Sequence, residues 1–139
     1  MSAVAIPSYS FETIGAGVEV CVSTAHTFGT DAFLLSHFAA PRGEALACDL
    51  GSGCGIIPLL WMRGDTAPKC VYALDIQPDA IKQMLQSIER SGLSGRMFPL
   101  HADLRALPPD LPKGSFDLVV CNPPYKAEGT GLEIGRAHV

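Results

Sequence analysis

The sequence contains no long apolar run and few charged residues. Only 17% of its 139 residues are charged, against 47% hydrophobic, and the formal net charge is −4. No apolar stretch approaches the ~20 residues of a membrane-spanning helix, and the N-terminus lacks the basic start of a signal peptide. We therefore expect a single soluble, cytoplasmic globular domain that does not bind a membrane.

Neither the cysteines nor the histidines show the spacing of metal ligands. No two of the five cysteines form a CxxC pair, and the four histidines are scattered. The pattern argues against a disulfide framework and a metal site, and it predicts free, buried thiols. The cysteines are Cys21, Cys48, Cys54, Cys70 and Cys121. The small number of cations also predicts that any RNA-binding surface is gathered by folding or lies elsewhere.

Apolar patterning along the chain predicts alternating strands and helices. A hairpin is expected from residues 11–14 and 18–23, and strands over 45–50, 70–74, 96–100 and 116–121. Helices are predicted over 32–40, 56–63 and 79–91, with Thr30 or Asp31 as the N-cap of the first. This order predicts an α/β fold, a Rossmann-like sheet of four parallel strands with helices, preceded by a short N-terminal β-hairpin.

A polar residue stands at or just beyond the carboxyl end of every predicted parallel strand. These residues are Asp49, Asp75, Asp103 and Asn122. In an open parallel sheet the carboxyl ends of the strands share one rim, and ligands bind there. We therefore expect the four side chains to converge on a ligand site.

The first parallel strand runs into a glycine-rich turn, Gly51-Ser52-Gly53-Cys54-Gly55, before a helix. Its spacing is not the GxGxxG of a dinucleotide site, and the carboxylate of Asp49 suits a cationic ligand better than a pyrophosphate. Asp75 lies 26 positions after Asp49, close to the ~20-residue offset at which an acid meets a ribose diol. A tight strand-to-helix turn without a ligand would use the same glycines.

The fourth parallel strand ends in Asn122-Pro123-Pro124-Tyr125. Each proline restricts itself and the residue before it to extended geometry, so the segment is expected to be stiff. It would present an amide, free carbonyls and an aromatic ring to a flat group that carries an NH2. A proline-rich turn of no special function is the alternative.

With these motifs in their order, the chain resembles the class I S-adenosylmethionine-dependent methyltransferases, and within them the adenine-N6 branch that carries NPPY. The resemblance covers residues 28–125. The block Phe28-Gly29-Thr30-Asp31-Ala32 is most similar to the bacterial enzymes that modify an adenine beside the anticodon of a valine tRNA.

The resemblance implies S-adenosylmethionine as cofactor, tRNA as substrate, no metal, and a monomer for the full-length enzyme. The cofactor would contact Phe28, Thr30, Asp49, Gly51, Gly53, Asp75, Asp103 and Asn122. In this assignment, Asp49 faces the methionine part, Asp75 the ribose and Asp103 the adenine. The catalytic segment would be Asn122, Pro123, Pro124 and Tyr125, in which Asn122 and Pro123 accept the hydrogens of the target amine and Tyr125 stacks on the base.

Other functions are compatible with parts of this pattern. A glutamine-N5 methyltransferase of peptide release factors shares NPPY, because a glutamine amide also presents an NH2. A fragment that binds S-adenosylmethionine without turnover is a further alternative. A nicotinamide-dependent oxidoreductase is disfavoured by the glycine spacing.

The C-terminal residues suggest a boundary within the chain. Residues 1–132 are expected to form the N-terminal and cofactor-binding part of a methyltransferase domain. Residues 133–139 match the translation of a common sequencing-adapter string, so we interpret them as a non-native tail.

Overall fold

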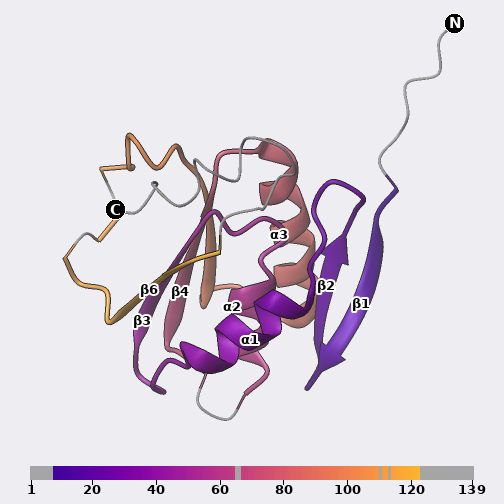
Figure 1. The fold of residues 1–139 in the computed structure, drawn as a ribbon, viewed down its shortest axis with the longest axis horizontal. Coiled ribbons are helices and arrows are strands. Elements are labelled where there is room, and N and C mark those ends of the chain that lie inside the picture. The colour runs from indigo at the N-terminus through magenta and orange to yellow at the C-terminus, as the bar shows by residue number, and fades with distance from the viewer. Residues whose placement is uncertain (1–7, 65–66, 110, 113, 123–139) are drawn as a thin grey trace, which may run out of the picture.

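The computed structural model describes residues 8–64, 67–109, 111–112 and 114–122. Both Pro123–Tyr125 and the interpreted tail at 133–139 lie outside these residues. The strands are β1 (Ser10–Gly15), β2 (Val18–Val22), β3 (Leu46–Leu50), β4 (Cys70–Asp75), β5 (Met97–His101) and β6 (Leu118–Cys121). The helices are α1 (Thr30–Phe38), α2 (Ile56–Met62) and α3 (Pro78–Ser91) (Figure 1).

Four of the strands form one parallel sheet in the order β5-β4-β3-β6. This confirms the predicted α/β fold with four parallel strands. The register pairs Leu50 with both Leu74 of β4 and Cys121 of β6. The next residue of each strand, Gly51, Asp75 and Asn122, therefore lies in one row across the rim of the sheet.

The two faces of the sheet are covered differently. Ala47 of β3 and Val71 of β4 pack in the larger core with α2 and α3. Their alternating neighbours Cys48 and Leu74 face a smaller core that includes Leu111 of the connection between β5 and β6. The period-two alternation places Asp49 on the same face as the helices, where it is only 1% exposed.

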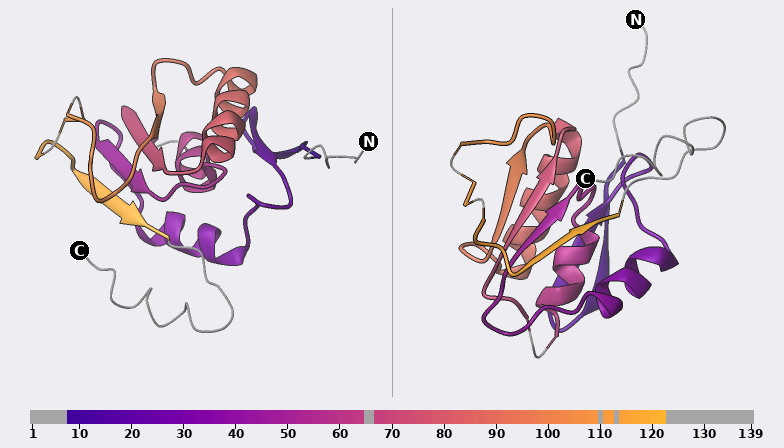
Figure 2. Two further views of the ribbon diagram at one scale, coloured as in Figure 1. Left: turned by 90° about the horizontal axis from the view of Figure 1, so that it is seen from above. Right: turned by 60° about the vertical axis from the view of Figure 1, so that its left-hand side comes forward.

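The predicted N-terminal hairpin is present and packs on the outer side of α3, away from the sheet (Figure 2). The amides of Glu19 and Cys21 in β2 donate to the hydroxyls of Ser91 and Ser87 on α3. Hence α3 is held between the sheet and the hairpin, and side-chain hydrogen bonds join it to β2.

Two sequence predictions are wrong in detail. Helix α1 begins at Thr30, so neither Thr30 nor Asp31 is the N-cap; extended Gly29 occupies that position and no side chain caps it. Cys121 is exposed and Cys70 is partly exposed, although buried thiols were predicted. In the edge strand β6, Val120 is buried, and the next residue, Cys121, points to the opposite, exposed face.

Candidate ligand site at the rim of the sheet

An open cavity of about 760 Å³ lies at the carboxyl-end rim of the sheet. We call it the rim pocket. The connection between β2 and α1 forms one wall, and the glycine-rich turn, the end of β4 and Asn122 form the others. The residues that line it are 25–32, Asp49, 51–53, 56–57, Asp75, Gln77 and Asn122.

The glycine-rich turn has a left-handed backbone at three positions, Gly51, Gly53 and Gly55. A side chain at Gly51 or Gly53 would meet no atom within 4 Å, so these two glycines are required by their φ angles and leave open space in front of the backbone. A Cβ at Gly55 would instead lie 2.8 Å from Met84 Cγ and 2.9 Å from Met97 Cε. The last glycine is therefore needed for packing as well as for its φ angle.

Asp75 connects the end of β4 to the glycine-rich turn. One carboxylate oxygen accepts the N–H of Gly53 at 2.8 Å, and the other accepts the N–H of Gln77 at 2.9 Å. Each oxygen keeps a further lone pair for a ligand, because a carboxylate can accept about four hydrogen bonds. Asp75 is thus held in a fixed orientation beside the open turn.

Asp49 is a buried carboxyl at the base of the rim pocket. Its Oδ2 accepts the hydroxyl of Ser52 at 2.5 Å, whereas its Oδ1 has no hydrogen-bond partner among the described residues. Burial raises the pKa of Asp49 to about 7; the Ser52 hydrogen bond opposes this shift and the charge of Asp75 adds to it. Among the described residues that line the rim pocket, no lysine or arginine offers a counter-charge to the ionised form of Asp49.

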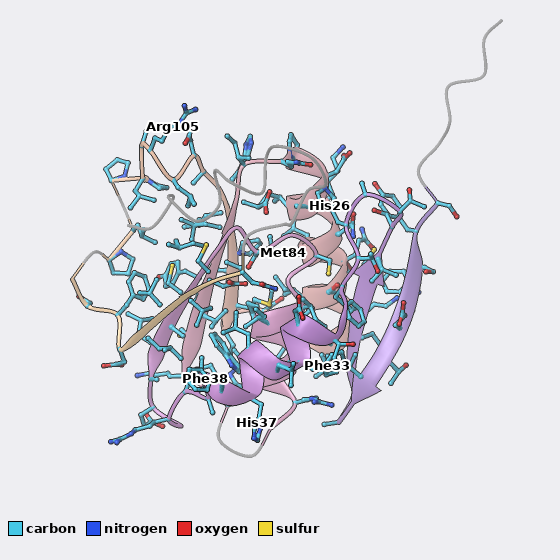
Figure 3. All side chains as sticks on the ribbon, viewed as in Figure 1. His26, Phe33, His37, Phe38, Met84 and Arg105 are labelled. Carbon is cyan, nitrogen blue, oxygen red and sulfur yellow. The ribbon has the colours of Figure 1, made fainter. Side chains whose placement is uncertain are left out.

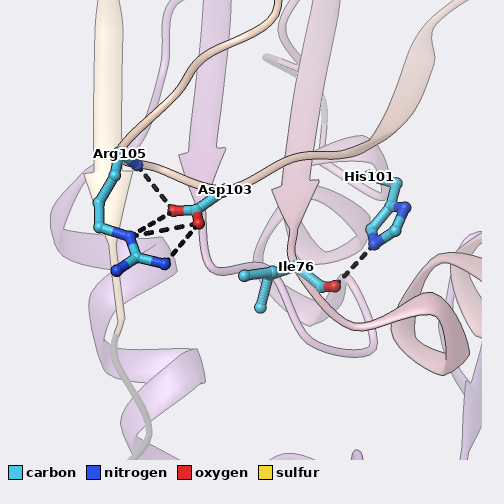
Figure 4. Close-up of polar contacts among 4 residues, drawn as sticks. All are labelled: Ile76, His101, Asp103 and Arg105. Atoms are coloured by element: carbon cyan, nitrogen blue, oxygen red, sulfur yellow. Dashed lines mark hydrogen bonds and ion pairs between the residues drawn. The ribbon is translucent and has the colours of Figure 1, made fainter.

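Seven of the eight residues predicted to bind the cofactor line the rim pocket: Phe28, Thr30, Asp49, Gly51, Gly53, Asp75 and Asn122. Asp103 is not among its lining residues. Its carboxylate accepts the backbone and side-chain N–H groups of Arg105, with a shortest distance of 2.7 Å (Figure 4), and these bonds lower the pKa of Asp103 to about 2. Convergence on the rim is therefore seen for three of the four polar residues at the strand ends.

A second, more apolar cleft adjoins the rim pocket. It lies along α1 and the end of β6, and Asp31 and Asn122 line both cavities. Leu34 and Phe38 on α1 expose 65% and 88% of their surface, and Phe38 is labelled in Figure 3. Asn122 therefore stands between a polar cavity and an apolar one.

Three lining residues with polar side chains, His26, Thr27 and Gln77, were not predicted from the sequence. No motif marks His26, whose backbone is held both by Ser23 and by Gln83 of α3. One signal was available: Gln83 is a polar residue on the buried face of α3, 1% exposed, and its amide binds the carbonyl of His26.

A parallel sheet whose rim carries a left-handed glycine turn and a fixed carboxylate defines the Rossmann-like class of α/β proteins. The chain belongs to the methyltransferase small domain family, whose model matches residues 22–137.

Two curated relatives from Flavobacterium share one name. The chain is 35% identical over 106 residues to a protein of Flavobacterium psychrophilum named tRNA1(Val) (adenine(37)-N6)-methyltransferase. The aligned region is 76% of this chain and 44% of the relative. A protein of Flavobacterium johnsoniae with the same name is 36% identical, with the same shares covered. The chain thus spans less than half the length of these curated relatives.

A solved structure with the same fold is that of TYW2 from M. jannaschii in complex with AdoMet. It superposes with a TM-score of 0.61 at 19% identity, over 84% of this chain and 52% of that one. Among the described residues, no cluster of three or more His, Cys, Asp or Glu side chains could hold a metal ion. None of the described helices is long and apolar enough to cross a membrane.

Proposed function

We propose that this chain binds S-adenosylmethionine in the rim pocket and is the cofactor-binding part of a cytoplasmic enzyme that methylates the N6 amine of an adenine in tRNA. The observation that carries the proposal is the convergence of Asp49, Asp75 and Asn122 with the open glycine-rich turn on one cavity of about 760 Å³. The names of the Flavobacterium relatives support adenine in tRNA over a release-factor glutamine as the methyl acceptor.

The residues of the rim pocket fit the chemical groups of this cofactor. Its α-ammonium group would supply the counter-charge that Asp49 lacks, and its ribose diol would use the free lone pairs of Asp75. The open backbone at Gly51 and Gly53 leaves room for close approach. To accept a hydrogen bond from the cofactor's adenine, as predicted, the Asp103 carboxylate would have to give up its ion pair with Arg105.

Asn122 is placed to act on the methyl acceptor. Asn122 lines both cavities, so an amine held in the apolar cleft would lie beside Asn122 and face the rim pocket. The amide oxygen of Asn122 would accept one amine hydrogen and orient the nitrogen lone pair toward the methyl group that the cofactor supplies. The amine proton would leave to solvent, and positioning would provide most of the rate enhancement. Pro123, Pro124 and Tyr125 complete the proposed catalytic segment.

Substitution Asp75→Ala is expected to weaken S-adenosylmethionine binding at least about tenfold, because a charged hydrogen bond contributes ~1.5–3 kcal/mol. The variant also removes the acceptor that fixes Gly53. Isothermal titration calorimetry of the wild type, Asp75→Ala and the control Asp79→Ala, an exposed acid outside the pocket, measures this. A wild type that unfolds cooperatively but binds no S-adenosylmethionine would contradict the proposal.

Substitution Asn122→Ala is expected to reduce methyl transfer to tRNA by about 10²–10³-fold, the usual loss when one polar group at a reacting centre is removed. Cofactor affinity should change far less. Transfer of a labelled methyl group to tRNA is the measurement, and Val119→Ala on the same strand, 51% exposed, is the control. Equal transfer rates in wild type and Asn122→Ala would rule out this role.

A further inference from the structure

Among the described residues, Asp31 and Asn122 line both the rim pocket and the apolar cleft along α1. If the cofactor occupies the rim pocket and the methyl acceptor occupies the cleft, the group that is transferred must lie where the two cavities meet. The side chains that flank this boundary are one neutral amide and one carboxylate. The proposed reaction uses the amide of Asn122 but not the carboxylate of Asp31.

The carboxylate of Asp31 is accessible to a ligand, because the residue is exposed and stands in the first turn of α1. It is not used as a helix cap, since no side chain caps α1. The ion pairs among the described residues are Arg90–Glu19 and Arg105–Asp103, so Asp31 belongs to neither. An acid in the first turn is favoured by the helix dipole, which is a structural role that needs no ligand.

The charges of the two cavities favour a cation at their boundary. The carboxylates of Asp31, Asp49 and Asp75 line the rim pocket, and the described residues that line the two cavities include no lysine or arginine. Asp49 is buried at the base of the pocket, and Asp75 accepts the N–H groups of Gly53 and Gln77. Asp31 is thus the carboxylate that stands at the boundary itself.

We propose that the carboxylate of Asp31 stabilises the positively charged sulfonium group of S-adenosylmethionine and makes the site favour this ligand over S-adenosylhomocysteine. This inference rests on the proposed function. S-adenosylhomocysteine lacks the methyl group, and its sulfur is a neutral thioether that a carboxylate does not attract. The charge of Asp31 would therefore favour binding of the methyl donor and release of the demethylated product.

These two ligands differ by one methyl group and one charge, so together they test this assignment. Isothermal titration calorimetry at neutral pH measures the affinity of each for the wild type, Asp31→Asn, Asp31→Glu and the control Asp79→Asn. Asparagine keeps the size and an acceptor oxygen but removes the charge, whereas glutamate keeps the charge. Asp79 is a matched control, because it is an exposed acid in the first turn of α3 and lines neither cavity.

We expect Asp31→Asn to weaken S-adenosylmethionine binding by about threefold to tenfold and S-adenosylhomocysteine binding by less than about twofold, because opposite charges at an exposed site attract one another only modestly. Asp31→Glu should keep most of the preference, and Asp79→Asn should match the wild type. Unchanged affinities in Asp31→Asn, or the equal loss for both ligands that a purely structural role in α1 would produce, would overturn the inference. A wild type that binds neither ligand would contradict the proposed function itself.

Discussion

Replacing Asp49 by asparagine is expected to stabilise the folded protein at pH 8 and to weaken S-adenosylmethionine binding by about tenfold to a hundredfold. The carboxyl is 1% exposed and only one of its oxygens has a partner among the described residues. Its pKa rises from 3.8 to about 7 on burial. At ~1.4 kcal/mol for each pKa unit, ionisation of Asp49 costs the folded state about 4 kcal/mol at pH 8.

Asparagine avoids the ionisation cost but buries an amide N–H without a partner, which costs ~1–3 kcal/mol. The expected net gain at pH 8 is therefore about 2 kcal/mol, while binding suffers because the counter-charge for the ammonium is lost. Urea denaturation of wild type and variant at pH 8, together with calorimetry, measures both effects. A variant less stable than the wild type at pH 8 would contradict the expectation.

The pH dependence of stability follows from the same carboxyl. Between pH 4 and pH 7 the unfolded chain has released the Asp49 proton while the folded chain still holds it. The free energy of unfolding of the wild type should therefore fall as the pH rises through this range, and the contribution of Asp49 becomes constant above pH 7. Asp49→Asn should lack this component. Superimposable pH profiles for the two proteins would show that Asp49 is not the group responsible.

Substitution Gly55→Ala is expected to destabilise the protein by about 2–4 kcal/mol. The new Cβ would lie 2.8 Å from Met84 Cγ and 2.9 Å from Met97 Cε, both in the buried core, at a φ of +82°. Overpacking a core costs ~1–3 kcal/mol, and a left-handed backbone adds ~1 kcal/mol for a residue with a Cβ. Thermal and urea denaturation measure the loss.

Gly92→Ala is the matched control for this effect. Gly92 ends α3 with a φ of +67°, and a Cβ there would meet no atom within 4 Å. It should cost only the ~1 kcal/mol of the backbone conformation. If both substitutions cost the same, the contact with the methionines would not be what requires glycine at position 55.

Much of the scaffold could be predicted from the sequence because its signals are local. The apolar residues of 70–74 and the glycines that follow Leu50 indicate a strand and a tight turn without reference to the rest of the chain. The rim then follows from topology, because the carboxyl ends of parallel strands must meet. This is why Asp49, Asp75 and Asn122 were placed close together correctly.

The remaining features depend on side chains that the sequence does not locate. Asp103 follows β5 as predicted, yet Arg105 two residues later binds its carboxylate. His26 lines the rim pocket, and one residue that anchors its backbone, Gln83, lies 57 positions away in the sequence. Similarly, the patterning of β3 predicts that Asp49 is near the rim, but not that one of its oxygens lacks a partner among the residues that the structure describes.

The serine hydroxyls of α3 stabilise a hairpin that two strands alone would hold only weakly. An isolated hairpin is marginal in water, and here the amides of Glu19 and Cys21 find their partners on a helix instead of a third strand. Gln83 of the same helix also holds the segment that carries His26. We therefore expect the hairpin and the pocket wall to open together. A ligand that binds in the pocket should then also slow amide exchange in β2.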